Sequence, residues 1–525
     1  MNATMPWLAR ASRRVISAML LIAASTGCWI VNHVQVEQLP RMNRTVESPV
    51  RVHMLDGSIA LFRHGATVSA SAVIGKGRRV SPTLAETTAV DSVPLAQVIG
   101  MEAFRTEFDP LQSLALTVLT TPVILGGVVA LSCIGNPKCF GSCPTAYSDS
   151  AGVSVLEAEG FSYSIARLFE DRDVDRLRAT PDASGRVRLE IRNEAFETHF
   201  INHVELLDVP HAADEYVVSD PEGRVLALRA LAPAVGATDR GGRDVRNVLA
   251  AHDGRAFASD PRRLRTATDS DAVDWIELTT PAPDADSAVV TLRLRNSLLT
   301  TVLLYDVMLG DRGAGAVDYL GRDLERIAPA MALGQWYAKQ MGLRVSVFDG
   351  SGWVAAGRVP DTGPVAWKDV AAIVPVPRGQ RTLRVRLTFV TDNWRIDRVA
   401  VARHWRRPVV RTVPLARVVD SRDMADTAAL ASLRAADRRY LETRPSQRFT
   451  AEFEAGPLAA GSSRTLFLAW QGYYTEWIRQ KWLAQGGAEP VDPAAPPSIG
   501  DALRRWRTDG AALTRQFEAT RVPVR

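Results

Sequence analysis

Cysteine is scarce in this chain of 525 residues, which contains only four. No cysteine follows Cys143. A protein stabilised by a framework of disulfides has cysteines spread along its chain, so the sequence excludes a disulfide-rich protein. The spacing of Cys133, Cys139 and Cys143 also lacks the C-x2-C pairs and the histidines of a zinc site. We predict one local disulfide, either Cys139–Cys143 or Cys133–Cys143, and one spare thiol.

Lysine is equally rare, with five positions, so that 58 of the 63 basic residues are arginines. Such a skew is typical of a GC-rich genome and says little about function. The 58 acidic residues nearly cancel the positive charge and leave a net charge of +5. We therefore predict no nucleic-acid partner. The 46% hydrophobic and 23% charged content is that of an ordinary globular protein, and the length suggests three or four domains.

Motifs of catalysis and of cofactor binding are absent from the sequence. There is no G-x-S-x-G element, no Walker motif and no dinucleotide fingerprint. Residues 171–175 begin like a calcium loop, but Arg176 replaces the required glycine. His199 and His203 lie four residues apart, yet their apolar neighbours indicate a strand, on which both histidines are structural. We predict no catalytic residue, no cofactor and no metal site, and hence a protein that is not an enzyme.

The N-terminus has the layout of a secretory signal. Three arginines among the first 14 residues precede an apolar run at 15–24, which leads into Ser25-Thr26-Gly27-Cys28. The Gly-Cys pair resembles the lipobox of bacterial lipoproteins. That resemblance implies that residues 1–28 form a lipoprotein-type signal peptide and that Cys28 is the lipid attachment site. An uncleaved membrane anchor is the alternative.

A second apolar segment covers residues 111–135. No charged residue occurs at the 28 positions between Asp109 and Lys138, and this length suits a membrane span. Pro122 and the Gly126-Gly127 pair also fit a bent path. We expect a membrane-associated helix or, alternatively, one buried against protein, with the C-terminal body outside the cytoplasm. A two-span inner-membrane protein with a cytosolic C-terminal body is the competing topology.

Alternating apolar and polar residues predict the fold class. We expect a mainly β, multidomain protein with β-sandwich-like units, one apolar helix and a partly helical C-terminal region. The strict alternation of Leu383 to Phe389 is typical of a strand with one buried face. A helix is predicted near 320–341, with Pro329 kinking or splitting it, and no internal repeat of fixed period stands out. The predicted domains after the signal are a small β domain at 45–105, a β-rich domain at 145–330, a β-sandwich-like domain at 343–412 and a mixed helical and aromatic region at 413–525.

Aromatic residues gather near the end of the chain, at Trp470, Tyr473, Tyr474 and Trp477. Such a cluster could form a stacking platform for a sugar or a peptide. The alternative is an aromatic collar that closes the last domain.

The element Ser142-Cys143-Pro144-Thr145-Ala146-Tyr147 follows the apolar segment. It resembles a group of uncharacterised bacterial envelope lipoproteins in which an apolar segment is followed by Ser-Cys-Pro-x-x-Tyr and a β-rich domain. Further blocks at 193–198, 295–299, 394–397 and 472–479 fit the same group. The resemblance implies an envelope location and brings no reaction. We therefore expect a non-catalytic binding or scaffolding lipoprotein that contacts the membrane through its lipid and 111–135, with a glycan or a protein as partner. An exported carbohydrate-active hydrolase is the alternative.

Overall fold

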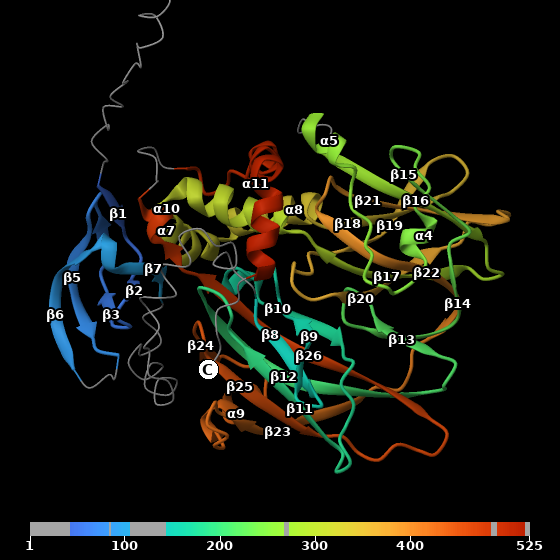
Figure 1. Cartoon of the computed structure of the whole chain (residues 1–525), viewed down its shortest axis with the longest axis horizontal. Helices are drawn as coiled ribbons and strands as arrows, with labels where there is room; N and C mark the ends of the chain where they lie inside the picture. The colour runs from blue at the N-terminus through green and yellow to red at the C-terminus, as the bar shows by residue number, and fades with distance from the viewer. Residues whose placement is uncertain (1–42, 83–85, 105–142, 267–271, 485–490, 520–525) are drawn as a thin grey trace, which may run out of the picture. The chain divides into compact units, whose positions relative to one another are not determined.

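The computed structural model describes residues 43–82, 86–104, 143–266, 272–484 and 491–519 (Figure 1). The predicted signal with Cys28, the segment 111–135, Cys133 and Cys139 lie outside these ranges. No helix in the described part of the chain combines the length and the apolar character that crossing a membrane requires. The protein is mainly β, as its sequence pattern predicts.

Seven strands that the structure describes between residues 44 and 103 belong to the first sheet. It has the strand order β1-β4-β5-β3-β2-β7-β27, with β6 beside β5. The strand β27 (Ile478–Arg479) comes from the far end of the chain and pairs with β7, so this sheet is not a separate N-terminal piece. Its strands are β1 (Arg44–Val46), β2 (Val50–Met54), β3 (Ile59–Phe62), β4 (Ala66–Val68), β5 (Ala72–Val80), β6 (Thr87–Pro94) and β7 (Val98–Ala103).

A nine-stranded sheet forms the second unit, with the order β10-β26-β12-β23-β25-β11-β8-β9 and β24 beside β12. Its apolar side chains enclose one core. The strands come from two distant parts of the chain: β8 (Thr145–Ser150), β9 (Val153–Glu159), β10 (Asp171–Arg176), β11 (Arg186–Arg192) and β12 (Glu197–His211), then β23 (Arg411–Val419), β24 (Leu441–Thr443), β25 (Arg448–Glu454) and β26 (Ser463–Glu476).

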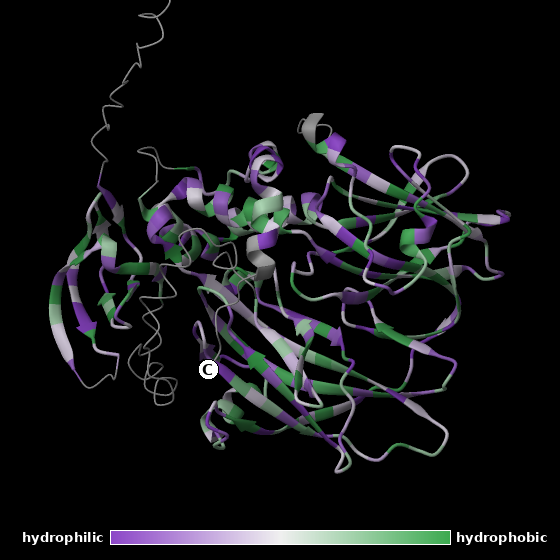
Figure 2. Ribbon diagram, viewed as in Figure 1, coloured by the Kyte–Doolittle hydropathy of each residue, from purple (hydrophilic) through white to green (hydrophobic). Residues whose placement is uncertain are grey.

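The intervening chain forms a third unit, in which a five-stranded barrel and a five-stranded sheet share one core. The barrel is β13-β14-β22-β17-β20 and the sheet is β15-β16-β21-β18-β19. Hydrophobic and hydrophilic residues alternate along these strands (Figure 2), as they do in β21, the strand predicted from its alternation. The strands are β13 (Tyr216–Ser219), β14 (Val225–Pro233), β15 (Gly236–Asp239), β16 (Val273–Pro281), β17 (Ser287–Asn296), β18 (Leu343–Phe348), β19 (Trp353–Val359), β20 (Lys368–Pro375), β21 (Thr382–Val390) and β22 (Trp394–Arg406).

The second and third units have the same topology. In the second unit the strand order is β10-β26-β12-β23-β25-β11-β8-β9. In the third unit the equivalent order is β20-β17-β22-β14, continued by β15-β16-β21-β18-β19. The two strands β14 and β15 together take the place of the single strand β23. The strand β23 pairs first with β12 and then with β25, just as β14 pairs with β22 and β15 with β16. The segments 145–296 and 343–476 are therefore two structural repeats, and each repeat supplies one half of each unit.

Local turns support the equivalence of the two repeats. In the turn between β8 and β9, the Asp149 carboxylate accepts the Gly152 N–H, and in the turn between β18 and β19 the Asp349 carboxylate accepts the Gly352 N–H. No repeat of fixed period stands out in the sequence, and the equivalence becomes evident only from the strand pairings. The predicted boundaries at 330 and 412 do not follow the units, because strands before 211 pair with strands after 411.

Helices join and cover these sheets. The predicted helix at 320–341 is divided into α7 (Gly315–Gly321) and α8 (Ile327–Gln340), and Pro329 lies in the first turn of α8, where a missing N–H costs little. The predicted C-terminal helix is present as α11 (Ile499–Ala519). The other helices are α4 (Arg246–Leu249), α5 (Pro261–Thr266), α6 (Leu298–Thr301), which continues as a π-helix (Val302–Leu309), α9 (Thr427–Leu433) and α10 (Gln480–Leu483).

Candidate ligand-binding site

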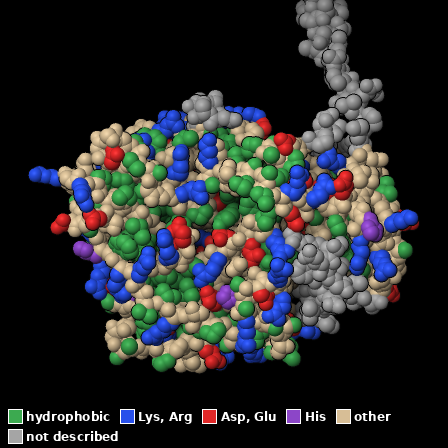
Figure 3. Space-filling view, turned by 180° about the vertical axis from the view of Figure 1, so that it is seen from behind, with side chains coloured by type: hydrophobic (Ala, Val, Ile, Leu, Met, Phe, Trp, Pro, Cys, Tyr) green, Lys and Arg blue, Asp and Glu red, His purple; other side chains and the backbone are tan. Residues whose placement is uncertain are grey.

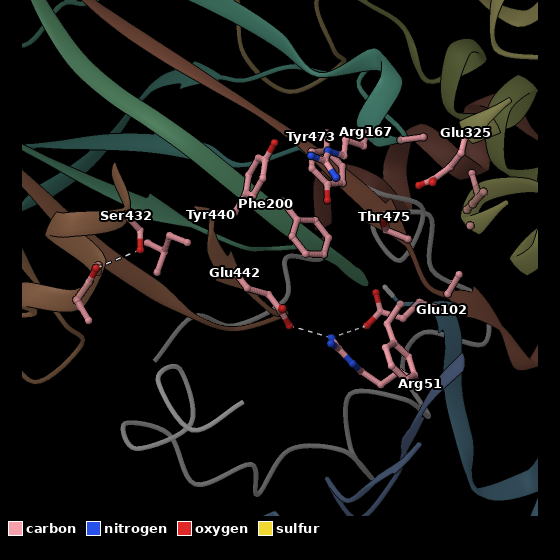
Figure 4. A pocket seen from close by; sticks show the side chains of 18 of the residues that line it. Arg51, Glu102, Arg167, Phe200, Glu325, Ser432, Tyr440, Glu442, Tyr473 and Thr475 are labelled. Carbon is pink, nitrogen blue, oxygen red and sulfur yellow. Dashed lines mark hydrogen bonds and ion pairs between the residues drawn. The ribbon is translucent and has the colours of Figure 1, made fainter. Parts of the chain in front are cut away.

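An open cavity lies beside the first sheet and the nine-stranded sheet (Figure 4). Arg51 of β2 and Glu102 of β7 line one part of it. Phe200 of β12, Tyr473 of β26 and Tyr440 line another part. The cavity therefore combines an aromatic wall with a group of buried charges.

The aromatic wall arises from strand register. Phe200 and Tyr473 are direct cross-strand partners, and their rings stack with centroids 4.7 Å apart and an interplanar angle of 10°. Tyr440 approaches edge-on, with its centroid 5.4 Å from Tyr473 and 6.4 Å from Phe200. Cross-strand aromatic pairs of this kind stabilise a sheet, and they fix the rings in place before any ligand arrives.

The orientation of Tyr440 is set by Glu170. The Tyr440 hydroxyl donates to Glu170 Oε2 at 2.7 Å, while Asn202 and Gln471 donate their amide N–H groups to Glu170 Oε1 at 2.7 and 2.9 Å. Burial and the neighbouring Glu170 carboxylate raise the pKa of Tyr440 to about 12. The phenol therefore stays neutral and its ring is held in one position.

The buried charges form a network centred on Arg51 (Figure 4). Its Nη1 atom donates to Glu102 Oε1 at 3.0 Å and to Glu442 Oε1, on β24, at 2.8 Å. Arg444 also donates to Glu442 Oε1, at 2.9 Å, and His53 Nε2 lies 2.8 Å from Glu102 Oε1. One guanidinium thus connects the first sheet to the nine-stranded sheet.

Both carboxylates of this network are held as anions. Burial alone would raise the pKa of Glu442, but the Arg51 and Arg444 guanidiniums outweigh it and lower that pKa to about 2. Arg51 likewise outweighs burial and lowers the pKa of Glu102. Burial lowers the pKa of His53 to about 4, so its imidazole is neutral near pH 7. A general acid needs a raised pKa, and neither carboxylate of this network has one.

The proposed aromatic platform is mostly buried. Trp470 is fully buried and donates its indole N–H to Asp175 at 3.0 Å. Tyr474, also fully buried, has its hydroxyl 2.9 Å from that of Tyr305. Trp477 stacks on His53 at 3.5 Å and donates to Thr198. Tyr474 and Trp477 thus contact other elements, Trp470 bonds within its own sheet, and Tyr473, which is 5% exposed, is the one residue of the four that lines the cavity.

The other residues that the sequence analysis considered, namely Cys143, His199, His203 and 171–175, lie outside the cavity. Cys143 is buried, and its predicted disulfide partners Cys133 and Cys139 lie outside the described residues, so the local disulfide stays a prediction. The Cys143 side chain packs in a hydrophobic core, and burial raises the pKa of the thiol well above its usual value. His199 and His203 lie on β12, as predicted, and residues 171–175 belong to β10 rather than to a calcium loop. No cluster of three metal-ligating side chains occurs among the residues that the structure describes.

Sequence reasoning missed most residues of the cavity, namely Arg51, Glu102, Phe200, Tyr440 and Glu442. The alternation of apolar and polar residues around Phe200 and around Tyr473 indicates only that each residue lies in a strand. Nothing in the sequence indicates that the two strands, β12 and β26, pair with each other. A buried charge inside a strand, such as Arg51 within Val50–Met54, is the one signal that could have drawn attention to this region.

Comparisons with known proteins carry little information about this site. No family model and no curated protein matches the sequence. Among solved structures, the crystal structure of a GH31 alpha-xylosidase from Xanthomonas citri aligns with 83% of this chain and 38% of its own, at 9% identity and a TM-score of 0.14. A likeness of that degree supports neither a shared fold nor a shared activity.

Proposed function

We propose that this protein is a non-catalytic bacterial envelope lipoprotein that binds a saccharide in the cavity between Arg51 and Tyr440. The observation that carries the proposal is the preformed aromatic group Phe200, Tyr440 and Tyr473 beside fixed charges of both signs. Saccharides present flat C–H faces that pack on aromatic rings and hydroxyls that bond to charged groups.

The ionisation state of Glu102 and Glu442 favours saccharide binding over saccharide hydrolysis. A glycosidase needs one protonated and one ionised carboxyl group on either side of the bond that breaks. Glu102 and Glu442 instead share the Arg51 guanidinium, which lowers the pKa of both. They are suited to orienting Arg51 and poorly suited to giving up a proton, so the hydrolase alternative has less support.

The cavity is tested by removing one ring. Tyr440→Leu keeps an apolar side chain but loses the ring edge and the bond to Glu170, so we expect saccharide affinity to fall about tenfold or more. A glycan array identifies the ligand, and calorimetry measures its affinity for both proteins. Trp353→Leu, a partly exposed aromatic of β19, is the matched control and keeps full affinity. Unchanged affinity in Tyr440→Leu, or the absence of any bound glycan, would refute the proposal.

The envelope location is tested at Cys28. Because acylation requires this thiol, we expect Cys28→Ser to leave an unprocessed precursor and to abolish labelling by a fatty-acid probe. Cys143→Ser is the control, because Cys143 is buried in the folded protein and lies far from the signal in sequence. Fatty-acid labelling that persists in Cys28→Ser would rule out the lipoprotein assignment.

A phosphatase reporter fused after Arg525 tests on which side of the membrane the C-terminal body lies. Phosphatase activity supports a body outside the cytoplasm.

A further inference from the structure

A second cavity lies between the two equivalent β units and is rich in arginine. Arg176 and Arg178 reach it from the end of β10, Arg293 from β17 and Arg398 from β22. Tyr216 and Trp367 supply aromatic surface to the same cavity. On the face shown in Figure 3, basic and acidic side chains are interspersed. Around this cavity, four of the eleven lining residues are arginines.

Acidic groups neutralise only part of this charge. Arg293 Nη1 donates to Asp369 at 2.9 Å, and its Nε lies 3.3 Å from Asp397. The Arg178 guanidinium lies 4.0 Å from Glu157. These carboxylates, with the exposed His252, are the other titratable groups around the cavity.

Arg176 and Arg398 lack such partners. The Arg176 side chain donates to the carbonyl oxygen of Val217 at 3.0 Å, and no carboxylate of the described residues forms an ion pair with it. Within the same described ranges, Arg398 has no carboxylate within ion-pair distance, although its side chain is partly buried. Two guanidiniums in one hollow therefore keep donors available for an anion.

Aromatic rings hold these guanidiniums in place. Arg176 and Arg398 lie over the Tyr216 ring, with their central carbons 5.0 and 5.7 Å from its centroid. Burial, with the nearby Asp369, raises the pKa of Tyr216 to about 12, so that ring stays uncharged. Arg293 lies over Trp367 at 5.8 Å. Stacking restricts the guanidinium planes and lowers the entropy lost when an anion binds.

We infer that this cavity is a second binding site, specific for a small organic anion that carries a carboxylate or another oxyacid group on a ring. Arg176 and Arg398 would donate paired N–H groups to the anionic oxygens, a geometry that guanidinium matches well. The apolar face of the ring would pack against Tyr216 or Trp367. This inference is independent of the saccharide cavity, since the two cavities share no lining residue.

The test uses glucuronate, glucose and inorganic sulfate as probes, with calorimetry at low ionic strength. We expect glucuronate to bind, sulfate to bind more weakly and glucose not to bind at this site. Arg398→Gln and Arg176→Gln should each weaken glucuronate binding about tenfold or more, because each removes a charged hydrogen-bond donor. Added salt should weaken the binding as well.

Two control variants separate this site from other effects. Arg255→Gln makes the same charge change at a side chain that is 78% exposed and pairs with Asp253, and it should leave glucuronate affinity unchanged. Tyr440→Leu should also leave it unchanged, so a failure of the saccharide proposal does not decide this one. In the Tyr440→Leu background, in which the saccharide cavity is impaired, glucose binding as tightly as glucuronate or sulfate binding without glucuronate would overturn the inference. Equal losses of glucuronate affinity in Arg255→Gln and Arg398→Gln would overturn it as well. Thermal unfolding of each variant verifies that it is folded.

Discussion

Arg51→Met destabilises the protein by about 3–5 kcal/mol, which is the cost of removing one partner from a buried ion network. The Arg51 side chain is 4% exposed and is the shared donor to Glu102 and Glu442, whose side chains are 1% and 10% exposed. Methionine has a similar length but leaves both carboxylates without that donor. Urea unfolding, followed by tryptophan fluorescence, measures the loss.

Two further variants isolate the cause of this loss. Arg79→Met, in the same sheet, breaks an ion pair with Asp56 whose side chains are 39% and 52% exposed, and it should cost about 1 kcal/mol or less. Adding Glu102→Gln to Arg51→Met removes the carboxylate that has lost its guanidinium, whereas Glu442 keeps Arg444, and should recover part of the stability. A loss in Arg51→Met no larger than that in Arg79→Met would contradict the proposed network.

The fold class could be predicted because it depends on local pattern. Strands such as β21 alternate between buried and half-buried residues, and α11 has a helical sequence, so both appear at the predicted places. The same information does not say which strands pair. The nine-stranded sheet joins β12 to β26 across more than 250 residues, and only that pairing brings Phe200 beside Tyr473.

The repeat was hidden for a related physical reason. Each β unit takes half of its strands from each repeat, so the chain crosses between units instead of completing one before the next. Equivalent strands share alternation and turns, because a core requires apolar character and volume more than particular side chains. Asp149 and Asp349 mark equivalent turns, yet aspartate before glycine is common in turns and identifies no repeat by itself.

The aromatic residues show why residue type alone did not locate the site. Trp470 is an attractive stacking residue in sequence, but its position on the central strand β26 places it in a core. Tyr473, three residues later, lines the cavity. The difference is one of strand face and of neighbouring elements, and neither is set by local sequence.

Lys368→Met is expected to be the other severely destabilising substitution. Lys368 begins β20, and its Nζ lies 2.9 Å from Asp173 and 3.0 Å from Asp175 on β10, the equivalent strand of the other unit. The ammonium is 14% exposed and Asp175 is 4% exposed, so the pair bridges the two units at a nearly buried point. Without it, two neighbouring carboxylates remain uncompensated, and we expect a loss of about 3–5 kcal/mol at pH 8.

The loss in Lys368→Met should depend on pH in a defined direction. Burial already raises the pKa of Asp175 to about 6, although Lys368 opposes that shift, so removing Lys368 raises it further. A carboxyl group whose pKa is higher in the folded than in the unfolded protein loses stability as pH rises. The variant is therefore closer to wild type at pH 5, where Asp175 is protonated, than at pH 8. Lys339→Met, at an exposed lysine of α8, is the control and should change stability little at either pH. Unfolding curves at both pH values provide the measurement, and a deficit that is equal at pH 5 and pH 8 would show that lost packing, rather than the unpaired carboxylates, causes it.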